Sequence, residues 1–190
     1  MHTLVLVVGD NLHDQLDRFS SNLEVEPHED QIPDDEIESM AEHYAVSRDD
    51  LATLVTKLPD YFGDKGCLKD GKLFRISTTN PRGLFDWYEV GGQWKGFLKL
   101  REPRPIRRLF GLLSAGETMQ TTSARKSQID RQALLDDPPM VLVVGGEWFE
   151  STIFAEGDAV EKWKAEFAQL FAEIPDDKRL TVVDVHRSTD

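Results

Sequence analysis

Residues 158–185, DAVEKWKAEFAQLFAEIPDDKRLTVVDV, give the clearest indication of the fold. The first part has apolar side chains at helical spacing, which predicts an amphipathic helix that Asp158 caps and that packs against a core. Turn residues at 175–177 end this helix, and the β-branched run 180–185 predicts a buried strand. The apolar stripe of the helix consists of Val160, Trp163, Phe167, Leu170, Phe171 and Ile174.

Two more apolar runs predict buried strands. Residues 3–8 are mostly β-branched and stop at a glycine, which favours a strand buried on both faces. Asp10 or Asn11 then caps a short helix at 12–19. The second run is 140–144.

The middle of the chain predicts a β-hairpin. Two strand-like runs, 85–90 and 93–100, flank Gly91 and Gly92, and a two-glycine turn can adopt the positive φ angles that a tight hairpin requires. The run 73–76 predicts a further short strand within an otherwise loop-like stretch.

Residues 24–60 carry twelve acidic side chains against two Lys or Arg residues. Helical periodicity at 34–46 and 48–58, with Ser47 as the N-cap between them, predicts an acidic helical insertion. Runs of like charge are usually solvated faces, so the insertion alone indicates no function. The length of 190 residues favours a single domain, 1–190, that contains this insertion.

The order of these elements predicts the α+β class. We expect an antiparallel sheet with helices on one face, of the split βαβ, ferredoxin-like type, plus the acidic helical insertion. A doubly wound parallel sheet is the alternative, but the chain has too few strand–helix alternations to wind such a sheet twice.

Composition excludes several classes of protein. The net charge of −13 disfavours binding to double-stranded nucleic acid and to anionic membranes. The single cysteine, Cys67, excludes an internal disulfide framework, and no signal peptide is visible. The longest apolar runs fall far short of the roughly 20 residues that span a bilayer. These features predict a cytoplasmic protein without a membrane partner, and they leave a homo-oligomer open.

Common catalytic signatures are absent from the sequence. It contains neither of the two standard phosphate-binding glycine loops, nor the signatures of zinc proteases and α/β-hydrolases. We therefore expect no metal and no cofactor.

The segment 86–94, DWYEVGGQW, is the strongest candidate for a functional surface. Aromatic side chains stack planar groups for about 1–3 kcal/mol per base, and glycines allow a ligand to approach the backbone. The alternative is a hairpin whose aromatic side chains only fill the core. The candidate ligand-binding residues here are Trp87, Tyr88, Gly91, Gly92, Gln93 and Trp94.

Residues 95–131 are basic. Arg125 and Lys126 lie at the start of a helix expected at 127–135, where charged side chains and helix N-terminal amides both favour a phosphate or carboxylate. The alternative is a solvated basic face that balances the acidic insertion. Further basic candidates are Arg104, Arg107 and Arg108.

Four other side chains are candidates for ligand contacts, acid–base chemistry or metal binding. Asp10, Asp184 and His186 lie at the ends of buried strands, where sites on open sheets often collect. Asp130 lies close to the basic pair described above. The alternative is that Asp184 and His186 are simply hydrogen-bonded within the fold.

Residues 80–96, NPRGLFDWYEVGGQWKG, resemble a family of mostly uncharacterised proteins from phages, prophages and actinobacteria. In that family the pattern is Asn-Pro, a short spacer, Trp-Asp-Trp-Tyr, one residue, then Ile-Gly-Gly-Arg-Trp. The stretches 124–130 and 175–186 are also similar to the family. The resemblance implies a functional role for the aromatic and glycine residues and for the basic pair, without implying an activity. Gln93 stands where the family usually has Arg, so a bidentate anion clamp is not expected there.

Three functions follow from these features and from the phage setting that the resemblance implies. The first is binding of a small anionic or nucleotide-like ligand, in an anti-defence role that sequesters a nucleotide-derived host signal in the host cytoplasm. The second is a hydrolase that acts on such a nucleotide. The third is an acidic protein-interaction or inhibitor module that uses residues 24–60.

Overall fold

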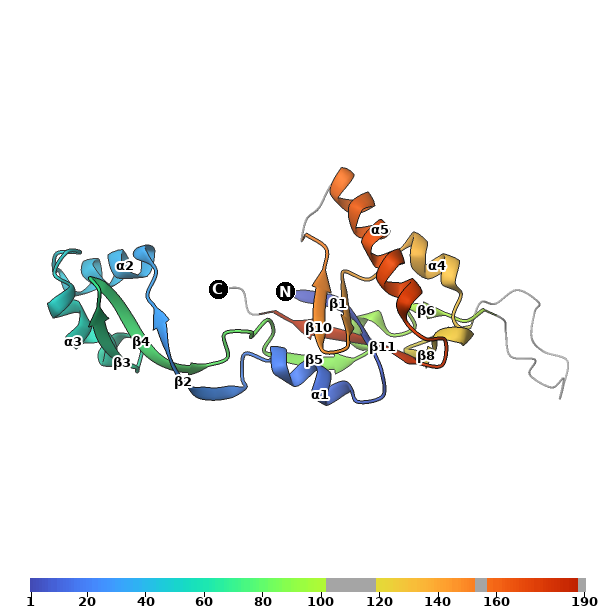
Figure 1. The fold of residues 1–190 in the computed structure, drawn as a ribbon, viewed down its shortest axis with the longest axis horizontal. Coiled ribbons are helices and arrows are strands. Elements are labelled where there is room, and N and C mark those ends of the chain that lie inside the picture. Colours follow the sequence, from blue (N-terminus) through green and yellow to red (C-terminus); the bar gives the residue numbers. More distant parts are fainter. Residues whose placement is uncertain (102–118, 153–156, 188–190) are drawn as a thin grey trace, which may run out of the picture. The chain divides into compact units, whose positions relative to one another are not determined.

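The computed structural model describes residues 1–101, 119–152 and 157–187 (Figure 1). The basic candidates Arg104, Arg107 and Arg108 lie outside these described residues.

The chain forms two compact units. Unit 1 comprises residues 1–21 and 82–190, and unit 2 comprises residues 22–81. The sequence predicted one domain, 1–190, with an insertion; in the structure each of the two units has a sheet and a hydrophobic core of its own.

Unit 1 is built on a sheet that has six strands within the described residues. The strands follow the order β10-β9-β1-β11-β5, and β8 also pairs with β11. β1 and β9 are parallel and the other pairs are antiparallel, which confirms the α+β class. The strands are β1 (His2–Val8), β5 (Trp87–Val90), β8 (Ser123–Arg125), β9 (Val141–Val144), β10 (Glu147–Glu150) and β11 (Arg179–His186).

Helices pack against both faces of this sheet. One face packs against α5 (Asp158–Glu173) and α4 (Arg131–Asp136), whose buried side chains include Trp163 and Leu134. The opposite face packs against α1 (Leu12–Leu16) and the 3-10 helix η1 (Asp17–Phe19), through Leu16 and Phe19. The expectation of helices on one face was therefore incomplete. Successive side chains of β1 point to opposite faces of the sheet. The apolar side chains on each face are buried only if other elements pack against that face.

A split βαβ unit lies within the sheet. β10 and β11 run in the same direction, α5 connects them, and β9 and β1 lie between them. The expected ferredoxin-like plan is not matched, because its four strands are all antiparallel, whereas β1 and β9 are parallel neighbours, and β5 and β8 extend the sheet further.

The hairpin expected around the two glycines does not form. β5 pairs with β11, and the chain then turns through the 3-10 helix η2 (Gly92–Trp94), in which Trp94 N donates to Gly91 O. The next strand, β6 (Leu98–Lys99), pairs with β7 (Gln120–Thr121) in a separate sheet. The glycines therefore support a helical turn instead of a hairpin turn.

Several helix ends differ from the sequence expectation by a few residues. α1 follows Asn11, whose side chain makes no capping hydrogen bond. α5 follows Gly157, so Asp158 is the first helical residue and not the cap. The helix expected at 127–135 is divided into η3 (Lys126–Gln128) and α4, because the side chain of Asp130 caps α4.

Unit 2 has a three-stranded antiparallel sheet in the order β2-β4-β3. Its elements are β2 (Glu24–Gln31), α2 (Asp34–Tyr44), α3 (Leu51–Tyr61), β3 (Lys65–Lys69) and β4 (Lys72–Thr79). The acidic insertion expected at 24–60 is thus part of a larger unit, because β2 finds its partner β4 beyond that range. The buried core consists of Ile32, Ile37, Met40, Ala41, Leu54, Leu58 and Leu73.

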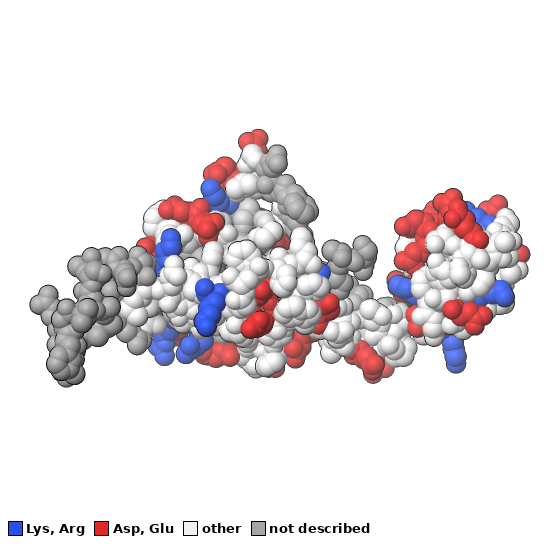
Figure 2. All heavy atoms as spheres, turned by 180° about the vertical axis from the view of Figure 1, so that it is seen from behind, with Lys and Arg blue, Asp and Glu red and all other residues white. Residues whose placement is uncertain are grey.

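The helices of unit 2 agree with the expected periodicity, but one cap differs. The side chain of Asp50 accepts a hydrogen bond from Thr53 N at 3.1 Å, so Asp50 and not Ser47 caps α3. The acidic side chains of 24–60 are exposed or partly buried, and Figure 2 shows acidic and basic side chains on the visible surface of the chain. This agrees with a solvated charged face.

Within residues 1–101, 119–152 and 157–187, no helix combines the length and the apolar composition that crossing a bilayer requires.

Candidate functional site

Two histidine–carboxylate pairs meet where β1 begins and β11 ends. His2 Nδ1 lies 2.9 Å from Asp184 Oδ1, and His186 Nδ1 lies 2.9 Å from Asp86 Oδ1. The antiparallel register places His2 opposite His186, and their ring centroids are 5.4 Å apart. Asp184 and His186 share a face because side chains alternate along a strand. These four residues are called the His–Asp cluster below.

Each carboxylate in the His–Asp cluster binds the Nδ1 atom of its histidine. A partner at Nδ1 fixes the orientation of the ring and leaves Nε2 as the nitrogen for other contacts. The hydrogen bond from His186 also lowers the pKa of Asp86, because it stabilises the charged carboxylate. The arrangement is suited to proton transfer or to donation of a hydrogen bond to an anion.

Trp87 extends the cluster outward. Its indole is stacked on the imidazole of His186, with ring centroids 5.4 Å apart and planes 9° apart, and its edge meets His2. The side chain is nevertheless 45% exposed. Trp87 therefore combines a fixed orientation with a large accessible aromatic surface, as a stacking surface requires.

The other two aromatic candidates lie elsewhere. Tyr88 is opposite Val185 on the other face of β5, where its hydroxyl lies 2.6 Å from His13 Nδ1. Trp94 is partly buried and packs against the hydrophobic core of the face that α5 covers. Adjacent residues of a strand point to opposite faces, so Trp87, Tyr88 and Trp94 do not form the single platform that the sequence suggested.

The two glycines make room for a buried carboxylate. A β-carbon on Gly92 would lie 2.4 Å from Cβ of Asp184, which is only 3% exposed. Gln93 N donates to Asp184 Oδ2 at 3.1 Å. Gly91, with φ 80°, begins the turn that brings this amide into place. Gly92 and the amide of Gln93 therefore hold Asp184 in the His–Asp cluster.

The basic pair does not form an anion site. Lys126 is 3% exposed, and its Nζ donates to the carbonyl oxygens of Phe171, at 2.6 Å, and Ile174. It therefore satisfies carbonyls at the C-terminus of α5. Burial lowers the pKa of Lys126. Arg125 is exposed on β8, where it pairs with Arg179 across the sheet.

The two remaining candidates are also separate from the cluster. Asp10 accepts a hydrogen bond from Arg179 Nε at 3.0 Å, at the opposite end of β11 from His186. Asp130 caps α4 by accepting from Ala133 N. Both residues have local structural partners, so the structure brings neither to the candidate site.

An open groove of about 560 Å³ runs beside β5. β5 supplies Trp87 and Tyr88 to its lining, and the α1–η1 segment supplies His13. The lining also contains three carboxylates, those of Asp17, Asp86 and Glu89. Asp86 belongs to both the groove and the cluster, and Trp87 lines the groove and stacks on His186. These two residues therefore link the two parts of the candidate site.

The groove favours hydrogen-bond donors. Three carboxylates accept N–H or N⁺–H groups, whereas they repel a phosphate in the same place. A planar group with N–H donors matches this lining, and His186 Nε2 already lies 3.5 Å from the N-terminal nitrogen of Met1. Within the described ranges, no group of three or more His, Cys, Asp and Glu side chains is arranged to hold a metal ion.

Comparison with known proteins gives no functional assignment. No family model, curated protein or solved structure matches the chain. Sequence reasoning identified Asp184, His186, Trp87 and Tyr88. It did not identify His2, which binds Asp184, or His13, which binds Tyr88, and it gave Asp86 no role beyond membership of the segment 86–94. His2 is the exposed first residue of the otherwise buried strand β1, and the sequence of that strand does not reveal a partner on another strand.

Proposed function

We propose that unit 1 binds a small planar ligand of the nucleobase or nucleotide class at Trp87. The position of Trp87 carries this proposal: the indole is stacked on His186, 45% exposed, and borders the groove beside β5. A base stacked on an aromatic side chain gains about 1–3 kcal/mol.

The groove supports the proposal by its size and polarity. Its volume of about 560 Å³ lies within the range of roughly 300–1,000 Å³ that is usual for small-molecule sites. Carboxylates such as Asp86 and Glu89 accept hydrogen bonds from the amino groups of bases. A ligand with few phosphates is favoured, because carboxylates line the groove and also pair with both histidines.

The resemblance to phage-type proteins extends the proposal to a biological setting. Binding without turnover removes a nucleotide-derived host signal from solution. This is the sequestering, anti-defence function that the sequence suggested for a protein of the host cytoplasm.

Titration of the full chain tests the binding proposal. Adenosine, AMP, ATP, ADP-ribose and cyclic dinucleotides are compared by thermal shift and calorimetry. A ligand present at 100 times its dissociation constant stabilises the folded state by about 2.7 kcal/mol. We expect stabilisation by at least one compound, and weaker stabilisation as the number of phosphates rises.

The variant Trp87→Ala should weaken that binding by roughly 10- to 100-fold, which corresponds to the loss of one stacked base. Leu68→Ala is the matched control, because Leu68 is similarly exposed but belongs to unit 2. Absence of stabilisation by every compound, or unchanged affinity in Trp87→Ala, contradicts the proposal.

A second candidate function is hydrolysis of a nucleotide. The observation that favours it is the pair of carboxylate-bound histidines whose rings are 5.4 Å apart, because one imidazole can act as a general base and the other as a general acid. His2→Gln and His186→Gln should then abolish product formation while binding persists. Recovery of unchanged nucleotides after long incubation with the unmodified protein excludes this function.

A further inference from the structure

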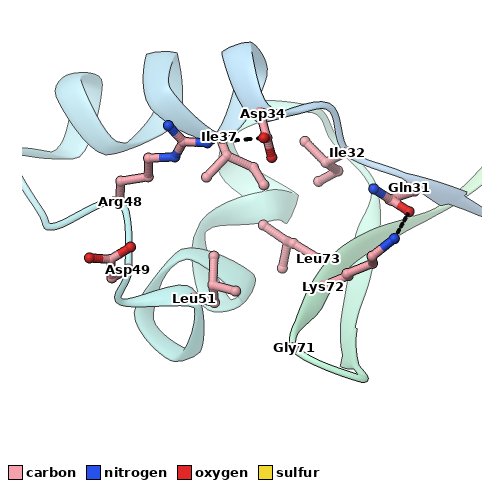
Figure 3. A pocket seen from close by; sticks show the side chains of 10 residues that line it. All are labelled: Gln31, Ile32, Asp34, Ile37, Arg48, Asp49, Leu51, Gly71, Lys72 and Leu73. Atoms are coloured by element: carbon pink, nitrogen blue, oxygen red, sulfur yellow. Dashed lines mark hydrogen bonds and ion pairs between the residues drawn. The ribbon is translucent and has the colours of Figure 1, made fainter.

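Residues of unit 2 alone form a pocket of about 230 Å³ (Figure 3). It lies among the end of β2, the start of α2, the start of α3 and the turn between β3 and β4. None of its lining residues belongs to the candidate site of unit 1. A ligand that binds in this pocket therefore occupies a second site, separate from the candidate site of unit 1.

The floor of the pocket is apolar. Ile32, Ile37 and Leu73 are buried members of the core of unit 2, and Leu51 packs against them. These side chains gather in the middle of Figure 3, where they face the pocket. A ligand that fills the pocket must bring apolar surface, because this floor offers no hydrogen-bonding groups.

The rim of the pocket is charged. Arg48 forms an ion pair with Asp34 at 3.2 Å, and Lys72 donates to the side chain of Gln31 at 3.1 Å. All four of these side chains are exposed. Exposed ion pairs are worth about 0–1 kcal/mol, so these rim groups can rearrange around a ligand at small cost.

One side of the rim carries opposite charges next to each other. Arg48 and Asp49 are consecutive residues, and both lie on the same side of the pocket in Figure 3, with Leu51 and Leu73 beyond them. The guanidinium has five N–H donors, so its ion pair with Asp34 leaves donors for a second carboxylate. The carboxylate of Asp49 accepts from an ammonium group.

We propose that this pocket binds a free α-amino acid with an aliphatic side chain. An α-amino acid carries its carboxylate and its ammonium on one carbon, which matches the neighbouring charges of Arg48 and Asp49. Its side chain packs against Leu51, the partly buried apolar residue of the lining. At about 30 Å³ for each water-sized group, a volume of 230 Å³ holds roughly eight non-hydrogen atoms, the size of valine or leucine.

Binding to the full chain is tested with L-leucine and two analogues that each lack one charge, leucinamide and 4-methylpentanoate. Methyl NMR follows Ile37, Leu51 and Leu73 during each titration. We expect saturable shifts with leucine at concentrations up to roughly 10 mM, and at least about tenfold weaker binding of both analogues, since each loses one charge-assisted contact.

Charge-removing variants locate the site. Arg48→Gln and Asp49→Asn should each weaken leucine binding by about tenfold or more. Lys57→Gln and Asp60→Asn are matched controls on α3 outside the pocket and should leave the affinity unchanged. The proposal is overturned by absence of saturable shifts, by equal binding of either analogue, or by unchanged affinity in Arg48→Gln or Asp49→Asn.

Discussion

Gly92 lies directly against the carboxylate of Asp184, and a β-carbon at Gly92 would come within 2.5 Å of Asp184 Oδ2. The glycine is therefore required by the packing of a buried acid, and not by the approach of a ligand. The same carboxylate binds His2 and the amide of Gln93. One buried side chain thus connects the glycine segment with the start of β1.

Gly92→Ala should strongly destabilise unit 1. The substitution places a β-carbon in left-handed backbone, at φ 45°, and also forces it into Asp184. Gly145→Ala is the matched control, because Gly145 has φ 61° but open space around it. We expect the control to lose about 1–2 kcal/mol and Gly92→Ala to lose about 1–3 kcal/mol more, measured by urea unfolding. Equal losses would show that Asp184 does not restrict this position.

Lys126→Met should lower stability without altering ligand binding. The substitution removes buried hydrogen bonds to the carbonyls of Phe171 and Ile174, at an expected cost of about 1–3 kcal/mol. Arg125→Met removes a neighbouring but exposed charge and should change the free energy of unfolding by no more than about 0.5 kcal/mol. Thermal unfolding and nucleotide titration of both variants check this prediction. A ligand-affinity loss confined to Lys126→Met, without a stability loss, would contradict it.

The pKa of Asp86 should depend on His186. The folded-state pKa is lowered by the hydrogen bond from His186, so the interaction stabilises the fold above the ordinary Asp pKa of about 3.9. That stability is lost as the pH falls through the lower, folded-state pKa. NMR titration of the carboxyl carbon should show a higher Asp86 pKa in His186→Phe, which lacks the N–H donor.

His2→Phe serves as the control for this titration. It removes the neighbouring imidazole, but the hydrogen bond between His186 and Asp86 remains. The Asp86 pKa should therefore stay low. In addition, Asp86→Asn should reduce the loss of stability on acidification below about pH 4. An Asp86 pKa that is the same in His186→Phe and in the unmodified protein would refute the assigned cause.

The two hydrophobic cores should respond separately to cavity-forming substitutions. Leu54 is fully buried in unit 2, and Phe167 is fully buried in unit 1. Leu54→Ala should cost about 2–5 kcal/mol and raise amide hydrogen exchange throughout β3 and β4. Phe167→Ala should have the corresponding effect on β1 and β11. Equal loss of protection in both units with either variant would show one cooperative unit.

The extent to which sequence predicted the fold depended on the local apolar pattern. The runs in β1, β9 and β11 and the stripe on α5 were identified because each apolar pattern agrees with its own secondary structure. β2 was missed, since its sequence EVEPHEDQ has few apolar side chains and it forms a strand by pairing with β4. The supposed hairpin was wrong for a related reason: β5 pairs with a strand from the far end of the chain.

Prediction of the candidate site was less complete. Trp87 and His186 were identified from residue type and from their place beside buried strands. Lys126 was given an anion-binding role because its position in sequence suggested a helix start, whereas the fold buries it under the end of α5. The pattern of charged residues along the sequence does not show whether a given charged side chain is exposed to solvent or buried.

By itself the sequence determined the charge, the α+β class and the positions of the main buried strands and helix. These properties depend on composition and on periodicity within short segments. Only the tertiary structure decided that His2 meets Asp184, 182 positions away, and that Trp87 stacks on His186. Strand register sets these contacts, and register depends on pairing between distant segments and on packing of both faces of the sheet.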